Sequence, residues 1–123
     1  HRYYGDKSLH RQSHGESFLS LLEHRLRGNG LYIFDEPEAA LSPSRQMYML
    51  CRIKQLVESG SQFIVSTHSP IAMAYPGADI YEIADNGLQL TELEQTPHYL
   101  LMKRFCLDHE GMLRQLGFGI PES

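Results

Sequence analysis

Two adjacent carboxylates stand directly after a short apolar run in the first third of the chain. Residues 31–34 read Leu-Tyr-Ile-Phe, and Asp35, Glu36, Pro37 and Glu38 follow. Side chains alternate along an extended segment, so Asp35 and Glu36 point to opposite sides and can divide the work. One carboxylate would hold Mg²⁺ through its water shell while the other polarises an attacking water, as metal-assisted nucleotide hydrolysis requires. The plainer alternative is that these acids only cap the helix that follows.

A histidine follows a second apolar run. Residues 62–66 read Gln-Phe-Ile-Val-Ser, and Thr67, His68, Ser69 and Pro70 come next. An imidazole at a strand end can hydrogen-bond a terminal phosphate or the attacking water. On its own, such a histidine is more often a satisfied loop residue. The two strand ends together are more specific, because both project into the crevice outside the carboxyl ends of the strands.

The segment between the two runs is typical of a helix. Ser42 can cap its first turn, Pro43 suits the first helical position, and Ser59 and Gly60 end it. Its predicted apolar stripe consists of Met47, Leu50, Ile53 and Val57. A strand, a helix and a strand over residues 31–66 predict an α/β fold with a right-handed β-α-β unit. Its two parallel strands should each be covered on both faces.

Weaker patterns predict the flanking elements. A helix should begin at Ser13 or Gly15 and end by Gly28, with an apolar side made of Phe18, Leu19, Leu22 and Leu26. Residues 1–15 are polar and read as an ordered loop or a chain end. Downstream, we expect a short helix at 71–74 and a hairpin with strands 79–83 and 88–93 around an Asn-Gly turn. One or two helices over 97–116, interrupted near Asp108, complete the prediction.

Along residues 11 to about 85, the order of these motifs resembles the ABC-type ATPases, and looks closest to their soluble, stand-alone members. Residues 31–38 look like their Walker B motif with the catalytic glutamate, 39–42 like the D-loop, and 66–69 like the switch-histidine region. Residues 13–16 resemble a degenerate signature motif, with His14 where the family usually has glycine. In that family the signature contacts the γ-phosphate bound by the opposite subunit. The alternative is that Ser13 simply caps a helix.

The resemblance implies a partial P-loop NTPase fold that uses ATP and Mg²⁺ and closes as a head-to-tail homodimer. It implies that Asp35 binds Mg²⁺ and that Glu36 and the switch residue His68 are catalytic. The nucleotide contacts that it implies are Ser13, His14, Gly15, Glu16 and Ser42.

The sequence lacks a phosphate-binding loop of the form G-x-x-x-x-G-K-[ST]. The segment Gly-Asp-Lys-Ser at 5–8 comes nearest, but it lacks the earlier glycine and a strand before it. We therefore expect residues 1–123 to be the C-terminal half of an ATPase domain, with a tail at 117–123. This half would depend on a P-loop-bearing N-terminal half or subunit and hydrolyse no ATP alone. A truncated gene, a proteolytic remnant or an engineered fragment would each have such a sequence.

Composition narrows the alternatives. The 123 residues are 41% apolar and carry a net charge of −4 without a block of like charges, which argues against wholesale binding of nucleic acid or membranes. The longest apolar runs are too short to cross a bilayer. Cys51 and Cys106 lie far apart and predict buried, reduced thiols in the cytoplasm. A non-catalytic interaction module and a metal-dependent nuclease built on Asp35 and Glu36 remain alternatives to the ATPase.

Two further patterns are weaker. His10 and His14 could ligate zinc if they lay on a helix, but no third ligand is evident. A few basic and aromatic residues could contact nucleic acid, namely Arg2, Tyr3, Tyr4, Lys7 and Arg11.

Overall fold

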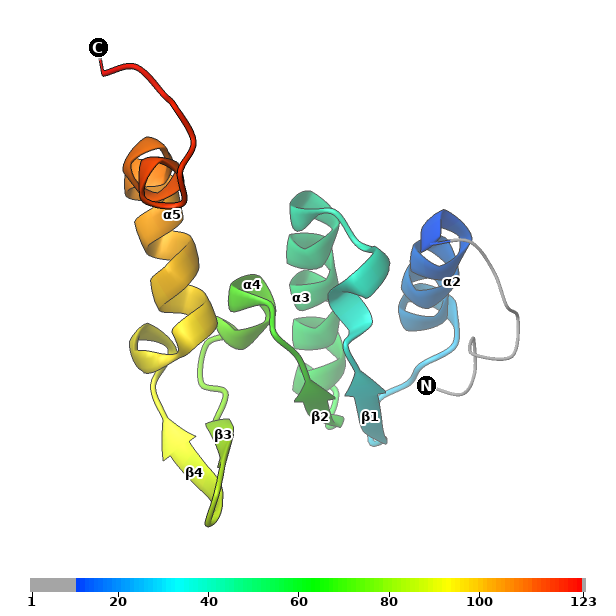
Figure 1. Cartoon of the computed structure of the whole chain (residues 1–123). Coiled ribbons are helices and arrows are strands. Elements are labelled where there is room, and N and C mark those ends of the chain that lie inside the picture. The colour runs from blue at the N-terminus through cyan, green and yellow to red at the C-terminus, as the bar shows by residue number, and fades with distance from the viewer. Residues whose placement is uncertain (1–10, 123) are drawn as a thin grey trace. The chain divides into compact units, whose positions relative to one another are not determined.

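The structure is a computed structural model that describes residues 11–122 (Figure 1). The predictions made for residues 1–10, including the segment at 5–8 and the zinc pair, lie outside the described residues, as do the side chains of residues 11–16. The chain divides into two compact units between Pro76 and Gly77. The first contains α2 (Arg11–His24), β1 (Leu31–Asp35), the 3₁₀ helix η1 (Pro37–Ala40), α3 (Pro43–Glu58), β2 (Gln62–Ser66) and α4 (Pro70–Met73). The second contains β3 (Ile80–Ala84), β4 (Gly87–Thr91), the 3₁₀ helix η2 (Leu93–Gln95) and α5 (Pro97–Gln115).

The two apolar runs form a parallel pair of strands joined by α3 (Figure 1). In the register, Leu31 lies opposite Gln62 and Asp35 lies opposite Ser66. The predicted β-α-β unit of two parallel strands is therefore confirmed. Because both strands run the same way, their C-terminal ends reach the same edge of the sheet.

The core lies on one face of this two-stranded sheet. Phe34 is 1% exposed and packs edge-to-face against Phe18 of α2, with ring centroids 5.1 Å apart. On the opposite face, Leu31, Ile33 and Ile64 are 59%, 57% and 53% exposed. The prediction that both faces are covered is therefore wrong for the described residues, because α2 and α3 both contribute to the same cluster around Phe34.

Helix α3 begins as predicted, but its buried side differs from the predicted stripe. The hydroxyl of Ser42 accepts a hydrogen bond from the backbone N–H of Arg45, which caps the first turn. The buried residues are Met49, Ile53 and Leu56, spaced by four and three positions. Two members of the predicted stripe, Met47 and Val57, are 61% and 39% exposed. Of the predicted stripe, Ile53 is buried and Leu50 packs against the core, whereas the prediction is wrong for Met47 and Val57.

Helix α2 begins earlier than predicted. It is already helical at Arg11, so Ser13 and Gly15 lie inside it and neither marks its start. Phe18 and Leu22 are buried against the core, as the sequence predicted. At its other end, the Arg52 guanidinium of α3 donates hydrogen bonds to the backbone oxygens of Leu22 and Glu23, at 2.8 and 3.2 Å. These contacts satisfy carbonyl groups that a helix C-terminus leaves without partners.

A second contact joins α2 and α3 on the surface. The hydroxyl of Tyr48 donates a hydrogen bond to the carboxylate of Glu23. This bond, followed by desolvation and the negative charge of Glu23, raises the pKa of Tyr48 above 10.0. The neutral hydroxyl is therefore the form that links the two helices.

The two turns that precede β1 and β2 contact each other through a buried serine. Ser61 is 6% exposed, and its hydroxyl donates to the backbone oxygen of Arg27 at 2.7 Å and accepts the Gly30 N–H at 3.2 Å. A Cβ on Gly28 would lie 2.4 Å from the backbone oxygen of Ser59, so the close approach of the turns requires glycine there.

The second unit begins with the predicted hairpin. Strands β3 and β4 are antiparallel, and Ala84 pairs with Gly87 across a turn made by Asp85 and Asn86. Gly87 has φ of 115°, a conformation that glycine adopts without strain. One face of the hairpin carries exposed apolar side chains, namely Tyr81, Ile83, Leu88 and Leu90.

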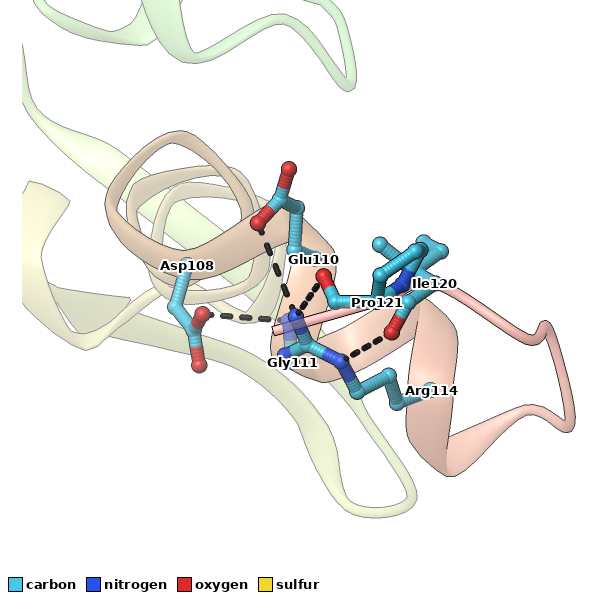
Figure 2. Close-up of polar contacts among 6 residues, drawn as sticks. All are labelled: Asp108, Glu110, Gly111, Arg114, Ile120 and Pro121. Carbon is cyan, nitrogen blue, oxygen red and sulfur yellow. Dashed lines mark hydrogen bonds and ion pairs between the residues drawn. The ribbon is translucent and has the colours of Figure 1, made fainter. Parts of the chain in front are cut away.

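Helix α5 is interrupted at Asp108, as the sequence predicted. Asp108 has φ of −153° and ψ of 57°, and its carboxylate accepts the Gly111 N–H at 3.1 Å, which caps the second helical segment (Figure 2). Beyond the helix, the Arg114 guanidinium donates to the backbone oxygens of Ile120 and Pro121 at 2.9 and 3.1 Å (Figure 2). These bonds fold residues 117–121 back along the end of the helix.

Two further predictions concern the cysteines and the possibility of a membrane span. Cys51 and Cys106 are free thiols, but both are exposed, so their predicted burial is wrong. Within residues 11–122, every helix is too short or too polar to span a bilayer.

Candidate functional site

The ends of β1 and β2 bring the two predicted chemical segments together. Asp35, the last residue of β1, lies opposite Ser66, the last residue of β2. One step further, the Glu36 N–H donates to the backbone oxygen of Ser66 at 2.6 Å. The loops that carry Glu36 and His68 therefore leave the same edge of the sheet side by side.

Glu36 has a left-handed backbone, with φ of 49° and ψ of 56°. For a residue other than glycine, this conformation costs about 1–2 kcal/mol. Non-glycine residues in sparsely populated backbone regions gather at functional sites, where the surrounding structure holds them in place. The unusual conformation therefore singles out Glu36 independently of its sequence motif.

The carboxylate of Glu36 faces the imidazole of His68. Its Oε2 lies 3.5 Å from Nδ1 of His68, and the two side chains are 48% and 64% exposed. A carboxylate beside an imidazole can hold the ring in one orientation and, in an open site, share a proton with water. The structure thus joins the two residues that the sequence predicted to be catalytic.

The loop after β2 is hydrogen-bonded to two helices, α3 and α4. The Ser69 N–H donates to the Thr67 hydroxyl at 3.0 Å, and the Ser69 hydroxyl accepts the Ala72 N–H at 3.2 Å, which caps α4. The same hydroxyl donates to the side-chain oxygen of Gln46 in α3. Gln46 in turn donates to the backbone oxygen of Leu41 at 3.2 Å, so it links the loop after β2 to the segment that precedes α3.

Asp35 is exposed at the end of β1, and the described residues make no hydrogen bond or ion pair to its carboxylate. Mg²⁺ in nucleotide sites is held by one or two carboxylates together with substrate phosphates and water. A single accessible carboxylate at a strand end fits that requirement. Within residues 11–122, no three His, Cys, Asp or Glu side chains gather into a group that could hold a metal ion.

The predicted nucleotide contacts stay predictions. The hydroxyl of Ser42 caps α3 and lies 3.3 Å from the hydroxyl of Ser44. Ser13, His14, Gly15 and Glu16 lie within α2, and their side chains are outside the description. Ser13 and Gly15 are the third and fifth residues of α2 as described, and their nucleotide contacts stay a prediction.

Glu38 also belongs to the site, although no role was predicted for it from the sequence. Its Oε2 accepts the backbone N–H of His68 at 3.4 Å, and its Oε1 is buried without a hydrogen-bond partner among the described residues. The only signal in the sequence is a second acid two positions after Glu36. A bond from a side chain to a distant backbone N–H leaves no sequence pattern, so this contact required the structure.

Known proteins resemble the part of the chain that carries this site. Residues 16–73 match the sequence family described as AAA ATPase domain. This part of the chain is ATPase-like. A protein of Haemophilus influenzae described as an uncharacterized ABC transporter ATP-binding protein is 36% identical over 80 residues. That alignment covers 64% of this chain and 28% of the relative, so the ATPase-like chain spans little more than a quarter of that protein. No solved structure matched the chain.

Proposed function

We propose that the chain serves Mg²⁺-dependent ATP hydrolysis as the C-terminal half of an ABC-type ATPase domain in the cytoplasm. The observation that carries the proposal is the strained backbone of Glu36, whose carboxylate faces His68 at the edge of the sheet where Asp35 ends β1. The family match supports it, because residues 16–73 include this whole segment.

Each residue of the site has a separate task in the proposed reaction. Glu36 takes a proton from water as the water oxygen attacks the γ-phosphorus of ATP, and ADP leaves with the electron pair of the bond that breaks. His68 donates a hydrogen bond to the γ-phosphate and is held in place by Glu36. Mg²⁺, held by Asp35, would neutralise phosphate charge. Ser42 and the α2 residues Ser13, His14, Gly15 and Glu16 are proposed to contact nucleotide.

The proposal includes a partner that carries a P-loop. Its support is the uncovered face of the sheet, where Leu31, Ile33 and Ile64 are more than half exposed. Within the described residues, β1 pairs with β2 alone, so both outer strand edges can accept further strands. A P-loop-bearing N-terminal half or subunit would cover this face, and two completed domains would close head to tail over ATP.

Calorimetry with Mg-ATP tests this proposal. The chain alone should show no binding, whereas the chain joined to a P-loop-bearing segment should bind Mg-ATP and hydrolyse it. Glu36→Gln should reduce turnover by about a thousandfold or more while binding persists, because it removes the base and keeps the shape of the side chain. Glu58→Gln, an exposed carboxylate on α3, is the matched control and should leave turnover unchanged.

The opposite result favours a different class of function. If the joined protein binds no nucleotide, the exposed apolar faces of the sheet and of the hairpin make a non-catalytic interaction module the better explanation. Cleavage of DNA with Mn²⁺ that is lost in Asp35→Ala would instead indicate the nuclease.

A further inference from the structure

We propose that Glu38 is a positioning residue that holds His68 in its place for hydrolysis, an inference that rests on the proposed ATPase function. Glu38 lies in η1, after β1, whereas His68 lies after β2, thirty residues further along the chain. The carboxylate of Glu38 accepts the backbone N–H of His68 at 3.4 Å. It thereby links the two loops that carry the catalytic pair.

Two carboxylates of one short segment contact different atoms of His68. Glu36 faces the imidazole, at 3.5 Å from Nδ1, and Glu38 holds the backbone N–H of the same residue. If only the imidazole ring were contacted, the backbone of His68 could still shift. With both contacts in place, the direction of the ring relative to Glu36 is fixed, which is what a precise contact to phosphate requires.

The environment of Glu38 argues against a purely structural role. Its Oε1 is buried without a partner among the described residues, and a charged oxygen in that position lowers the stability of the fold. Buried polar atoms without a partner are rare in native proteins, and the contact that Glu38 gains here is the one between its other oxygen and His68.

The loop after β2 has a second tether that does not involve Glu38. Ser69 is buried, caps α4 and donates a hydrogen bond to Gln46. Removing the Glu38 carboxylate should therefore leave α4 and the loop folded while His68 loses its backbone contact. This separation makes the role of Glu38 accessible to experiment.

The test compares Glu38→Ala with Glu38→Gln in the chain joined to its P-loop-bearing segment. Glu38→Ala should lower kcat about tenfold to a hundredfold with KM changed less than about twofold, because a small displacement of a catalytic group slows the chemical step. Glu38→Gln keeps an oxygen that can accept the His68 N–H, so it should retain kcat to within about threefold. The urea midpoint of Glu38→Ala should equal or exceed that of the wild type.

Three results would overturn the inference: wild-type kcat in Glu38→Ala, failure of Glu38→Gln to restore kcat, or a fall in stability that accompanies the fall in kcat. Glu94→Ala removes an exposed carboxylate from η2 and is the control for the loss of charge.

A further measurement separates this inference from the proposed function. In the 123-residue chain itself, hydrogen exchange at the His68 amide should be faster in Glu38→Ala than in the wild type or Glu38→Gln. If the joined wild type hydrolyses no ATP, the proposed function fails, whatever the exchange result. If exchange at His68 is the same in all three proteins, the positioning role fails, even where ATP is hydrolysed.

Discussion

Glu36 combines a backbone conformation that suits glycine with a side chain that the proposed chemistry needs. Its φ of 49° is one of two positive values among non-glycine residues of the described chain, the other being at Asn29. Asparagine tolerates this region and glutamate does so less readily. At residue 36, chemistry and stability therefore make opposite demands on the side chain.

At position 36 we therefore expect a glycine variant to be more stable than an alanine variant, the reverse of the order in a helix. Glu36→Gly should have a free energy of unfolding about 1 kcal/mol higher than Glu36→Ala, because only glycine adopts a left-handed backbone without a Cβ clash. Both variants should lack ATP hydrolysis. Urea denaturation measures the difference.

The exposed helical residue Met47 is the control site. There, the glycine variant should be less stable than the alanine variant by about 1 kcal/mol. If the glycine variant were less stable than the alanine variant at residue 36 as well, the backbone at Glu36 would carry no strain.

At the scale of single residues, the sequence was sufficient to propose Asp35, Glu36 and His68, because each follows an apolar run of strand length. The approach of Glu36 to His68 then follows from the parallel register. The role of Glu38 was out of reach, since it depends on where the backbone of a distant loop passes. The contacts predicted for residues 13–16 stay predictions.

Among the elements, the two turns that precede the strands are held together by one hydroxyl. Ser61 bonds to the backbone at Arg27 and at Gly30, so it joins the turn before β1 to the turn before β2. This contact lies at the opposite end of the strands from Glu36. The contact aligns the first residues of the two strands, and the parallel register then places their last residues opposite each other.

Ser61→Ala should lower the free energy of unfolding by about 1–2 kcal/mol, because the Gly30 N–H loses its partner in a buried place. Chemical denaturation monitored by circular dichroism would give the value. Ser59→Ala is a close control: its hydroxyl donates to the Gln55 backbone oxygen, but the residue is exposed, so a loss of less than about 0.5 kcal/mol is expected. Equal losses in the two variants would contradict the role given to Ser61.

The position of each element could be predicted better than its orientation. The cap at Ser42 and the break at Asp108 have local sequence signals, so both were predictable. Which side of α3 faces the core depends on where β1 and α2 lie, and Met47 and Val57 are as apolar as the residues that are buried instead. Periodicity alone allows more than one face in such a helix.

For the whole molecule, the uncovered sheet face is the largest departure from the predicted fold. The sequence of β1 has the composition of a strand covered on both sides, yet only one side is covered by described residues. Exposed apolar side chains alternate with core-facing ones in both strands, so the sequence is consistent with a two-sided sheet whose second cover is supplied by other residues.

Substituting that face should separate folding from assembly. The double variant Ile33→Thr and Ile64→Thr should keep its free energy of unfolding to within about 1 kcal/mol, because both side chains are more than half exposed and threonine suits strands. The same variant should no longer associate with the P-loop-bearing segment, as measured by sedimentation.

A control pair on the outer side of α3, Met47→Thr and Val57→Thr, removes similar apolar surface from the same unit. It should leave association intact. If both double variants failed to associate, the loss of apolar surface anywhere on this unit, and not on the sheet face in particular, would explain the result.

The interruption of α5 at Asp108 also bears on how the length of this helix can change over evolution. An extra residue inside a continuous helix turns everything after it by about 100° and displaces each later side chain from its neighbours. At Asp108 the helical phase is already broken, and the second segment begins from its own cap to the Gly111 N–H. Among relatives, insertions and deletions in this region should therefore gather at Asp108 and be rare on either side of it.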